Sequence, residues 1–371
     1  MGEQFATAHF QQMSTNLIES SNSLGDERSL LPGWHVKPKL VKGYPDCSLV
    51  IATCNRVTDV LELMEALSQR EDVPSETVIV DGSSQPCLET RLKAWAATSQ
   101  PPFELVFARC PQGLTRQRNV GIDLSTRRYV FFLDDDSRPL QNYFREMREV
   151  FVKDDKRKIG AVGGSVVNEL DRPLSGRWRF RLATGLVPKI QPMMYDNCGT
   201  STPKGLINPF RGLRRVDILP GCAFAFRREV LEQHRFSRFF AGYCQGEDLE
   251  MSLRVGANWQ VVCCGDAEIL HQMAPGARAG AFEKGRMEVC NKFFIWQRHR
   301  PQTRLIDRLR FWADVALLFT LDLLHFVRQP WHTWNLKHAA GLLSGTLRCL
   351  LAPPEYSEPE ARREYELTFD A

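Results

Sequence analysis

Short apolar runs alternate with helical patterns in the first half of the chain, and this alternation constrains the fold more than any other feature. Four runs have the length of a buried strand: 48–52, 77–80, 104–107 and 129–133. Apolar residues at helical spacing follow from 60 to 67 and from 140 to 151, and a further helix is predicted over 115–123. Strands that alternate with helices form parallel β-α-β units with helices on both faces. We therefore predict an α/β fold with a Rossmann-like, mostly parallel sheet flanked by helices.

The sequence predicts three regions along the chain. Residues 1–44 lack a basic start followed by an apolar run, so they are interpreted as a disordered or extended leader and not as a signal peptide. Residues 45–300 are predicted to form the α/β domain, and residues 301–371 a helical C-terminal region. Later strands are expected at 216–219, 259–264 and 268–270, and later helices at 227–233 and 248–254.

Two segments differ in composition from the α/β pattern. Segment 171–215 is rich in Pro, Gly and Arg, with nine basic and two acidic residues. It is too long for a passive connection, so it is either a binding loop or a solvated insertion. The apolar stretch 311–327 is interrupted by Asp314 and Asp322 and is shorter than the about 20 clean residues of a spanning helix. With 342–351 it predicts a packed or interfacial helix pair.

Overall charge and cysteine content exclude some classes of protein. The formal net charge of +4 is too small to indicate a nucleic-acid partner. The eleven cysteines are an odd number without a C-x-x-C pair, which favours buried thiols in a reducing compartment over disulfides or a cysteine metal site. We therefore expect a cytoplasmic protein.

Polar segments follow three of the predicted strands: 53–56, 81–84 and 134–136. In open α/β sheets, ligands bind outside the carboxyl ends of the strands, so these segments are expected to meet at one rim. Each of them alone could be an ordinary turn. Together they indicate a site.

Three adjacent carboxylates, Asp134 to Asp136, follow the fourth strand directly. Such neighbours repel one another unless a cation or basic groups neutralise them. If the backbone is extended there, Asp134 and Asp136 share a face and Asp135 points elsewhere. A few hard oxygen ligands suit Mg²⁺ or Mn²⁺ shared with a diphosphate.

Three other residues are candidates for the same rim, each with an ordinary alternative. Arg118 lies near the start of a predicted helix and could face a diphosphate, or be a surface arginine. Asp248 lies in the first turn of a helix. It could cap the helix, or it could act as the base that deprotonates a hydroxyl. His271 follows a short strand and could be either a structural histidine or a third metal ligand.

The ordered motifs of the chain resemble the inverting GT-A glycosyltransferases of family 2, over about residues 47–275. The matching segments are 48–56 (SLVIATCNR), 78–84 (VIVDGSS), 113–121 (GLTRQRNVG), 132–136 (FLDDD), 221–231 (GCAFAFRREVL) and 246–254 (GEDLEMSLR). The resemblance implies a hexosyltransferase-type enzyme with a Mn²⁺ or Mg²⁺ cofactor. It would transfer a sugar from a nucleotide-sugar donor to an acceptor hydroxyl with inversion at the anomeric carbon.

The resemblance also implies roles for single residues. Asp248 corresponds to the general base, and Asp134 and Asp136 to the D-x-D pair, with Asp136 as the likelier direct ligand of the metal. The residues expected to contact the donor are Thr53, Asn55, Arg56, Asp81, Arg118, Asp134 and Asp135. The residues expected to contact the acceptor are Gly221, Cys222 and Glu247. Asp81 would recognise the base, and His271 is the candidate third metal ligand.

Two departures from the family pattern stand out. Only one aspartate, Asp81, precedes Gly82, whereas the family often has two aspartates before this glycine. This difference affects the expected contacts with the nucleotide base. The Q-x-x-R-W motif of processive synthases is absent, and the most similar segment is 294–299 (FIWQRH), which does not match it. Together with the missing spanning helices, this favours an enzyme that adds a single sugar.

The acceptor is expected to be a glycan or a lipid-linked molecule, in polysaccharide, glycolipid or cell-surface glycan synthesis. Basic charge in 171–215 beside the apolar stretch 302–351 motivates a peripheral contact with the inner face of the cytoplasmic membrane. One alternative function is a sugar-phosphate nucleotidyltransferase, although 53–56 lacks the Gly-rich loop of that class. Another is a non-catalytic nucleotide-sugar-binding protein.

Overall fold

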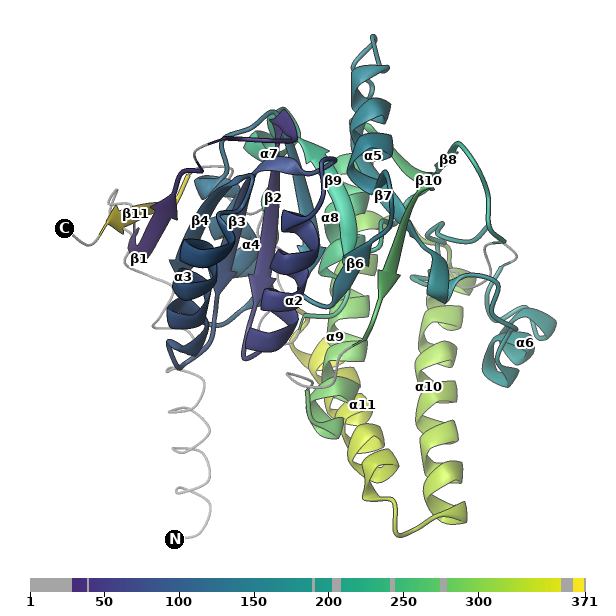
Figure 1. Ribbon diagram of the computed structural model, residues 1–371. Coiled ribbons are helices and arrows are strands. Elements are labelled where there is room, and N and C mark those ends of the chain that lie inside the picture. Colours follow the sequence, from purple (N-terminus) through teal and green to yellow (C-terminus); the bar gives the residue numbers. More distant parts are fainter. Residues whose placement is uncertain are drawn as a thin grey trace, which may run out of the picture.

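The computed structural model describes residues 29–38, 40–188, 191–201, 208–240, 244–273, 279–354 and 363–369 (Figure 1). Most of the predicted leader, residues 1–28, and the basic residues Lys189 and Lys204 of the insertion lie outside these ranges. The strands are β1 (Ser29–Val36), β2 (Tyr44–Thr53), β3 (Pro74–Asp81), β4 (Glu104–Arg109), β5 (Tyr129–Asp134), β6 (Ser137–Pro139), β7 (Ile159–Val166), β8 (Leu213–Arg215), β9 (Ala223–Arg227), β10 (Gln260–His271) and β11 (Tyr365–Phe369). The helices are α2 (Val57–Ser68), α3 (Cys87–Ser99), α4 (Leu114–Leu124), α5 (Tyr143–Val152), the 3₁₀ turn η1 (Val167–Glu169), α6 (Gly176–Ala183), α7 (Arg228–Gln233), α8 (Glu247–Gly256), α9 (Ala281–His299), α10 (Leu305–Arg328) and α11 (Thr333–Leu351).

One mixed sheet runs through the α/β part of the molecule, in the order β11-β1-β4-β3-β2-β5-β9-β7-β10-β6, with β8 paired to β10. Strands β4, β3, β2 and β5 are parallel, as the strand–helix alternation predicts. Strand β9 lies antiparallel between β5 and β7, and β7 is parallel to β10. The predicted α/β class with flanking helices is confirmed, and the antiparallel pairs make the sheet more mixed than the first half of the chain indicates.

Strand β2 is buried on both faces, which explains its uninterrupted apolar run. Leu49 and Ile51 pack with α2, α3 and α5 on one face of the sheet, whereas Val50 packs with α4, α7 and α8 on the other. Helix α4 approaches β2 so closely that a Cβ on Gly121 would lie 2.2 Å from Cγ1 of Val50. This close contact holds the second half of α4 against the middle of β2.

Several boundaries differ from the predicted ones. The strand predicted at 216–219 is wrong, because β8 ends at Arg215. Val216 still donates its N–H to the Val261 carbonyl oxygen of β10, and Leu219 is buried outside any strand. The two strands predicted at 259–264 and 268–270 form one strand, β10, with irregular pairing to β7 between Cys263 and Glu268. That irregularity explains why the apolar pattern breaks there.

Both ends of the described chain add strands that the sequence pattern did not predict. Strand β1 lies within the segment interpreted as a leader and pairs antiparallel with β4. Strand β11 lies within the predicted helical region and pairs parallel with β1. The Asp123 carboxylate of α4 accepts from the backbone N–H groups of Glu364 and Tyr365, which anchors β11 to the domain.

Helices α9, α10 and α11 pack on one another and extend beyond the sheet (Figure 1). Helices α9 and α11 approach closely at glycines, since a Cβ on Gly285 would lie 2.2 Å from the His338 carbonyl oxygen. Trp296 of α9 stacks on Phe311 of α10 with ring centroids 4.4 Å apart. Among the residues described, none of the helices has the combination of length and hydropathy needed to cross a bilayer.

We expect Gly121→Ala to destabilise the fold by about 1–3 kcal/mol, because the buried, β-branched Val50 cannot rotate away from the added methyl group. Denaturant unfolding measures this change. Gly176→Ala, which adds its Cβ to open space on α6, is the matched control and should change stability by less than about 0.5 kcal/mol. Equal effects of the two substitutions would contradict the tight contact between α4 and β2.

Candidate active site

A cleft of about 430 Å³ opens at the carboxyl ends of the parallel strands, as the sheet topology predicts. Its walls come from segments far apart in the chain. The lining residues are Ala52, Thr53, Cys54, Arg56, Gln112, Leu114, Gln117, Arg118, Asp134, Asp135, Gly221, Cys222, Cys244, Gln245, Gly246, Glu247, Asp248 and His271. Most of the residues singled out from the sequence therefore line one cavity.

The aspartate cluster occupies the transition from β5 to β6. Asp134 ends β5, whereas Asp135 and Asp136 form a turn before β6 begins at Ser137. The assumption of extended backbone through the cluster is therefore wrong. Asp134 and Asp136 nevertheless come together, because the turn brings both within reach of His271. Asp135 is instead bonded to Thr53 and Arg56.

Asp135 is held by the end of β2. It accepts a hydrogen bond of 2.6 Å from the Thr53 hydroxyl and one of 2.9 Å from Nη1 of Arg56. The same Nη1 lies 3.1 Å from Oδ2 of Asp136, so Arg56 neutralises both carboxylates. Burial raises the pKa of Asp135 to about 6, although the Thr53 and Arg56 hydrogen bonds act in the opposite direction.

Arg118 is buried at the base of the cleft, with 3% of its side chain exposed. Its Nη2 donates to Asp134 at 3.2 Å and to the Gly221 carbonyl oxygen at 2.9 Å, and its Nη1 donates to Glu247 at 3.0 Å. The guanidinium also lies over the Phe224 ring. Arg118 lines the cleft, but these contacts already engage it, so its predicted contact with a diphosphate stays a prediction.

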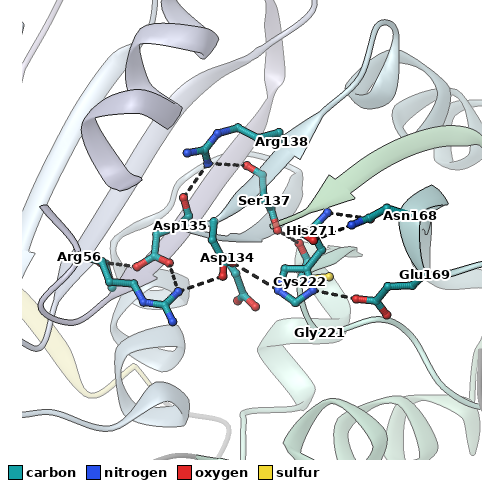
Figure 2. Close-up of polar contacts among 12 residues, drawn as sticks. Arg56, Asp134, Asp135, Ser137, Arg138, Asn168, Glu169, Gly221, Cys222 and His271 are labelled. Atoms are coloured by element: carbon teal, nitrogen blue, oxygen red, sulfur yellow. Dashed lines mark hydrogen bonds and ion pairs between the residues drawn. The ribbon is translucent and has the colours of Figure 1, made fainter. Parts of the chain in front are cut away.

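His271 ends β10 opposite the aspartate turn. Its Nδ1 is 2.9 Å from a Glu169 oxygen and its Nε2 is 3.4 Å from Oδ1 of Asp136. Asn168 fixes the backbone of His271 through two hydrogen bonds, to its carbonyl oxygen and from its N–H (Figure 2). The hydrogen bonds with Asp136 and Glu169 raise the pKa of His271 to about 9.

Asp134, Asp136 and His271 form a group that could hold a metal ion. One ligand atom from each lies within 4.8 Å of the others. Two carboxylates and an imidazole form a donor set that fits a divalent cation, and Glu169 orients the imidazole as carboxylates commonly do behind metal-bound histidines. The chemistry of these residues therefore fits the predicted cation.

Asp248 lies at the start of α8, where two backbone N–H groups hold its carboxylate. Oδ2 accepts from Gly221 at 3.2 Å, and Oδ1 accepts from Leu249 at 2.8 Å. A Cβ on Gly221 would lie 3.0 Å from Oδ2, so a side chain there would press against the Asp248 carboxylate. Next to it, burial and then the charge of Asp248 raise the pKa of Glu247. Cys222 is buried and its carbonyl oxygen accepts from Ser137.

The end of β3 lies beside the cleft but outside its lining. Asp81 is fully buried, and its Oδ1 accepts from the Ser83 backbone N–H at 2.9 Å. Its Oδ2 has no hydrogen-bond partner among the described residues. Asn55 adopts a left-handed conformation in the turn after β2 and donates its N–H to Ser83.

Three residues that support the site were not identified from the sequence. Gln117 of α4 donates to the carbonyl oxygens of Thr53 and Val80, which joins the ends of β2 and β3. Glu169 and Asn168 position His271 from a 3₁₀ turn about a hundred residues earlier in the chain. Gln117 lies within the 113–121 motif, whereas no local pattern marks the other two.

The chain is similar to several solved structures and to one sequence family. No curated protein sequence matched the chain. Solved structures with a similar arrangement include a mannosyltransferase, PcManGT from Pyrobaculum calidifontis, in complex with GDP-Man and Mn²⁺, at 16% identity and a TM-score of 0.48, with 93% of this chain and 96% of that chain covered. GalNAc-T7 with UDP, GalNAc and Mn²⁺ has 15% identity and a TM-score of 0.46, with 77% and 56% covered.

A third similar structure is S. aureus TarS 1–349 in complex with UDP-GlcNAc, at 14% identity and a TM-score of 0.42, with 82% of this chain and 91% of that chain covered. At sequence level, residues 48–235 match the profile described as glycosyl transferase family 2, which is half of the chain. The matched region runs from β2 to the end of α7 and so contains the aspartate turn, Arg118 and Gly221. The chain belongs to glycosyltransferase family 2 and is a glycosyltransferase of the GT-A type.

Proposed function

We propose that the protein is a metal-dependent, inverting glycosyltransferase that transfers one sugar from a nucleotide-diphosphate sugar to an acceptor hydroxyl. The observation that carries the proposal is the shared cleft, in which Asp134 and His271 of the candidate metal group and the carboxylate of Asp248 line the same cavity. A metal can stabilise a departing diphosphate, and a nearby carboxylate can take the proton of an attacking hydroxyl.

The residues of this chain have distinct roles in the proposed reaction. A bound cation would neutralise the charge that develops on the departing diphosphate. Asp134, Asp136 and His271 would hold that cation, with Glu169 fixing the orientation of the imidazole. Asp248 would accept the proton of the acceptor hydroxyl as its oxygen attacks the anomeric carbon from the face opposite the nucleotide. The N–H groups of Gly221 and Leu249 keep the Asp248 carboxylate in place during this step.

Arg118 and Gly221 couple the two halves of the proposed site. The Arg118 guanidinium contacts Asp134 on the metal side and Glu247, the neighbour of Asp248, on the base side. Gly221 accepts from Arg118 and donates to Asp248. We infer that this arrangement fixes the separation between leaving group and base. For the nucleotide we retain Thr53, Asn55, Arg56, Asp81 and Asp135 as expected contacts, and Gly221, Cys222 and Glu247 for the acceptor.

We infer Mn²⁺ as the better-suited cation. Mg²⁺ prefers an octahedron of oxygen atoms and gives up water reluctantly, whereas an imidazole beside two carboxylates is also acceptable to Mn²⁺. The presence of His271 in the group favours Mn²⁺ for this reason.

We further propose that the enzyme works at a membrane surface, on the inner face of the cytoplasmic membrane, with a glycan or lipid-linked acceptor. The hairpin tip, residues 324–337 between α10 and α11, exposes Val327 to 75% and Trp331 to 72%. Leu324, Trp334 and Leu336 are exposed as well. The tip carries basic Arg328 and Lys337 and no acidic residue. Exposed tryptophans with neighbouring basic residues are typical of interfacial anchors.

Asp248→Asn is expected to lower transfer by about 10²–10⁴-fold, because the amide keeps the shape of the side chain but cannot take a proton. Donor affinity should stay within about twofold, since the changed group serves the acceptor. Release of nucleotide diphosphate from a panel of nucleotide sugars measures the transfer activity. Calorimetric titration with the donor measures the donor affinity. The surface substitution Asp155→Asn is the control. Full transfer activity in Asp248→Asn would remove Asp248 from the proposed role.

Glu169→Gln is expected to weaken Mn²⁺ binding by about 10- to 100-fold, because the carboxylate that orients the His271 imidazole becomes a neutral amide. Titration of the purified protein with Mn²⁺ measures the affinity directly, independent of turnover. Glu268→Gln on the neighbouring β10 is a matched control, since Glu268 only lies near Arg211. Unchanged Mn²⁺ affinity in Glu169→Gln would exclude His271 as an oriented ligand.

The double variant Val327→Glu/Trp331→Glu is expected to lower co-sedimentation with anionic phospholipid vesicles by about tenfold or more, because two apolar anchors are lost. Its unfolding temperature should be unchanged, since both side chains are already exposed. Val152→Glu, an exposed apolar position on α5, is the control. If vesicle binding stays the same and only the oligomeric state changes, the tip is a protein interface and not a membrane anchor.

A further inference from the structure

A second cavity of about 380 Å³ adjoins the cleft, and half of its lining residues lie beyond the family-matched region. Three parts of the chain enclose it: α6 and the loop after it, the start of α8, and the inward faces of α9 and α10. Its volume lies within the about 300–1,000 Å³ of small-molecule sites. The cavity therefore depends on the basic insertion and on the C-terminal helices together.

The two cavities meet at the proposed base. Gln245, Gly246 and Asp248 line both of them, on the turn that begins α8. A ligand in the second cavity could thus present a hydroxyl to Asp248, while the first cavity holds the metal group on the other side. Gly246 has a φ of +91° and its Cβ position lies 2.9 Å from Ile295 of α9, so this junction is fixed by a left-handed glycine.

The charges around the second cavity cancel. Three cationic side chains line it, Arg177, Arg181 and Lys292, as do the three carboxylates of Asp248, Glu288 and Asp314. The Asp314 carboxylate of α10 binds both Arg181 at 2.5 Å and Lys292 at 2.6 Å, which ties α6, α9 and α10 together. Sites for phosphate or carboxylate groups instead gather an excess of arginine or lysine. The charge balance therefore favours an uncharged ligand.

The remaining lining alternates hydrogen-bonding and apolar groups. Tyr195 and Thr200 are buried and line the cavity, and their hydroxyls have no hydrogen-bond partner among the described residues. Trp178, Leu219 and Ile295 supply apolar surface. Hydroxyl groups of a ligand can both donate to carboxylates and accept from cations, so a polyhydroxylated ring matches this mixture of partners.

We propose that the second cavity is the acceptor site and that it takes an uncharged saccharide unit, whose hydroxyl meets Asp248. This proposal rests on the proposed glycosyl transfer and adds the chemical class of the acceptor. It also gives the basic insertion and α10 a direct role in acceptor choice, through Arg181 and Asp314.

The test uses the full chain with Mn²⁺ and the donor found by nucleotide-sugar screening. Octyl glycosides of neutral hexoses and N-acetylhexosamines are compared with octyl glucuronide and glycerol phosphate as acceptor probes. Nucleotide diphosphate release and product mass are measured for each. We expect neutral glycosides to stimulate release and to be glycosylated, and the charged probes to be poor acceptors.

A cavity-filling variant tests the location. Met287→Trp on α9 should raise the KM of the best neutral glycoside by about tenfold or more, because the larger ring fills space meant for the saccharide. The KM of the donor should stay within about twofold. Glu283→Trp places the same ring on the exposed side of α9 and should change neither value.

The outcomes distinguish a failure of the proposed saccharide site from a failure of the proposed glycosyl transfer. If the charged probes are the better acceptors, or if Met287→Trp leaves the glycoside KM unchanged, the saccharide site is overturned while the glycosyltransferase stands. If no nucleotide sugar is bound or turned over, with or without an acceptor, the proposed function fails and the saccharide site fails with it. Preferential use of neutral glycosides, lost in Met287→Trp and kept in Glu283→Trp, supports both.

Discussion

Repulsion among three consecutive carboxylates at the end of β5 is the constraint on which the rest of the site depends. Two like charges about 4 Å apart cost roughly 4 kcal/mol at an effective protein dielectric of about 20. The fold offsets this cost with cations from separate elements: Arg56 after β2, Arg118 on α4 and His271 at the end of β10. The segments that carry these residues are consequently held at one rim of the sheet.

The same need for neutralisation connects the two sides of the cleft. Arg118 cannot leave Asp134 without leaving Glu247 and the Gly221 carbonyl oxygen as well, because one buried guanidinium serves all three. Gly221 in turn holds Asp248 through its N–H. The aspartate turn and the start of α8 thus behave as one unit, which suits a reaction in which leaving group and base must be a fixed distance apart.

Local patterns predicted the elements that are regular and buried on both faces. The runs that became β2, β3, β4 and β5, and the stripe of α2, were located correctly because apolar periodicity is a property of neighbouring residues. The pattern failed where pairing partners are distant. Strand β11 exists because its backbone pairs with β1, more than 300 residues earlier, and neither segment has a strong pattern of its own. The strand predicted at 216–219 lies instead at 213–215, because its bounds are set by pairing with β10 and not by hydrophobicity.

The sequence by itself determined the family, the α/β class and the residue types at the rim, since the ordered motifs and their strand-end positions are local features. Only the tertiary structure decided how those residues pair. It placed Asp135 against Thr53 and Arg56, buried Arg118 between two carboxylates, and brought Glu169 to His271 across about a hundred residues. It also created the second cavity beside Asp248, from helices whose sequences carry no motif for it. Such pairings depend on which surfaces the packed sheet brings together, and that information is distributed over the whole chain.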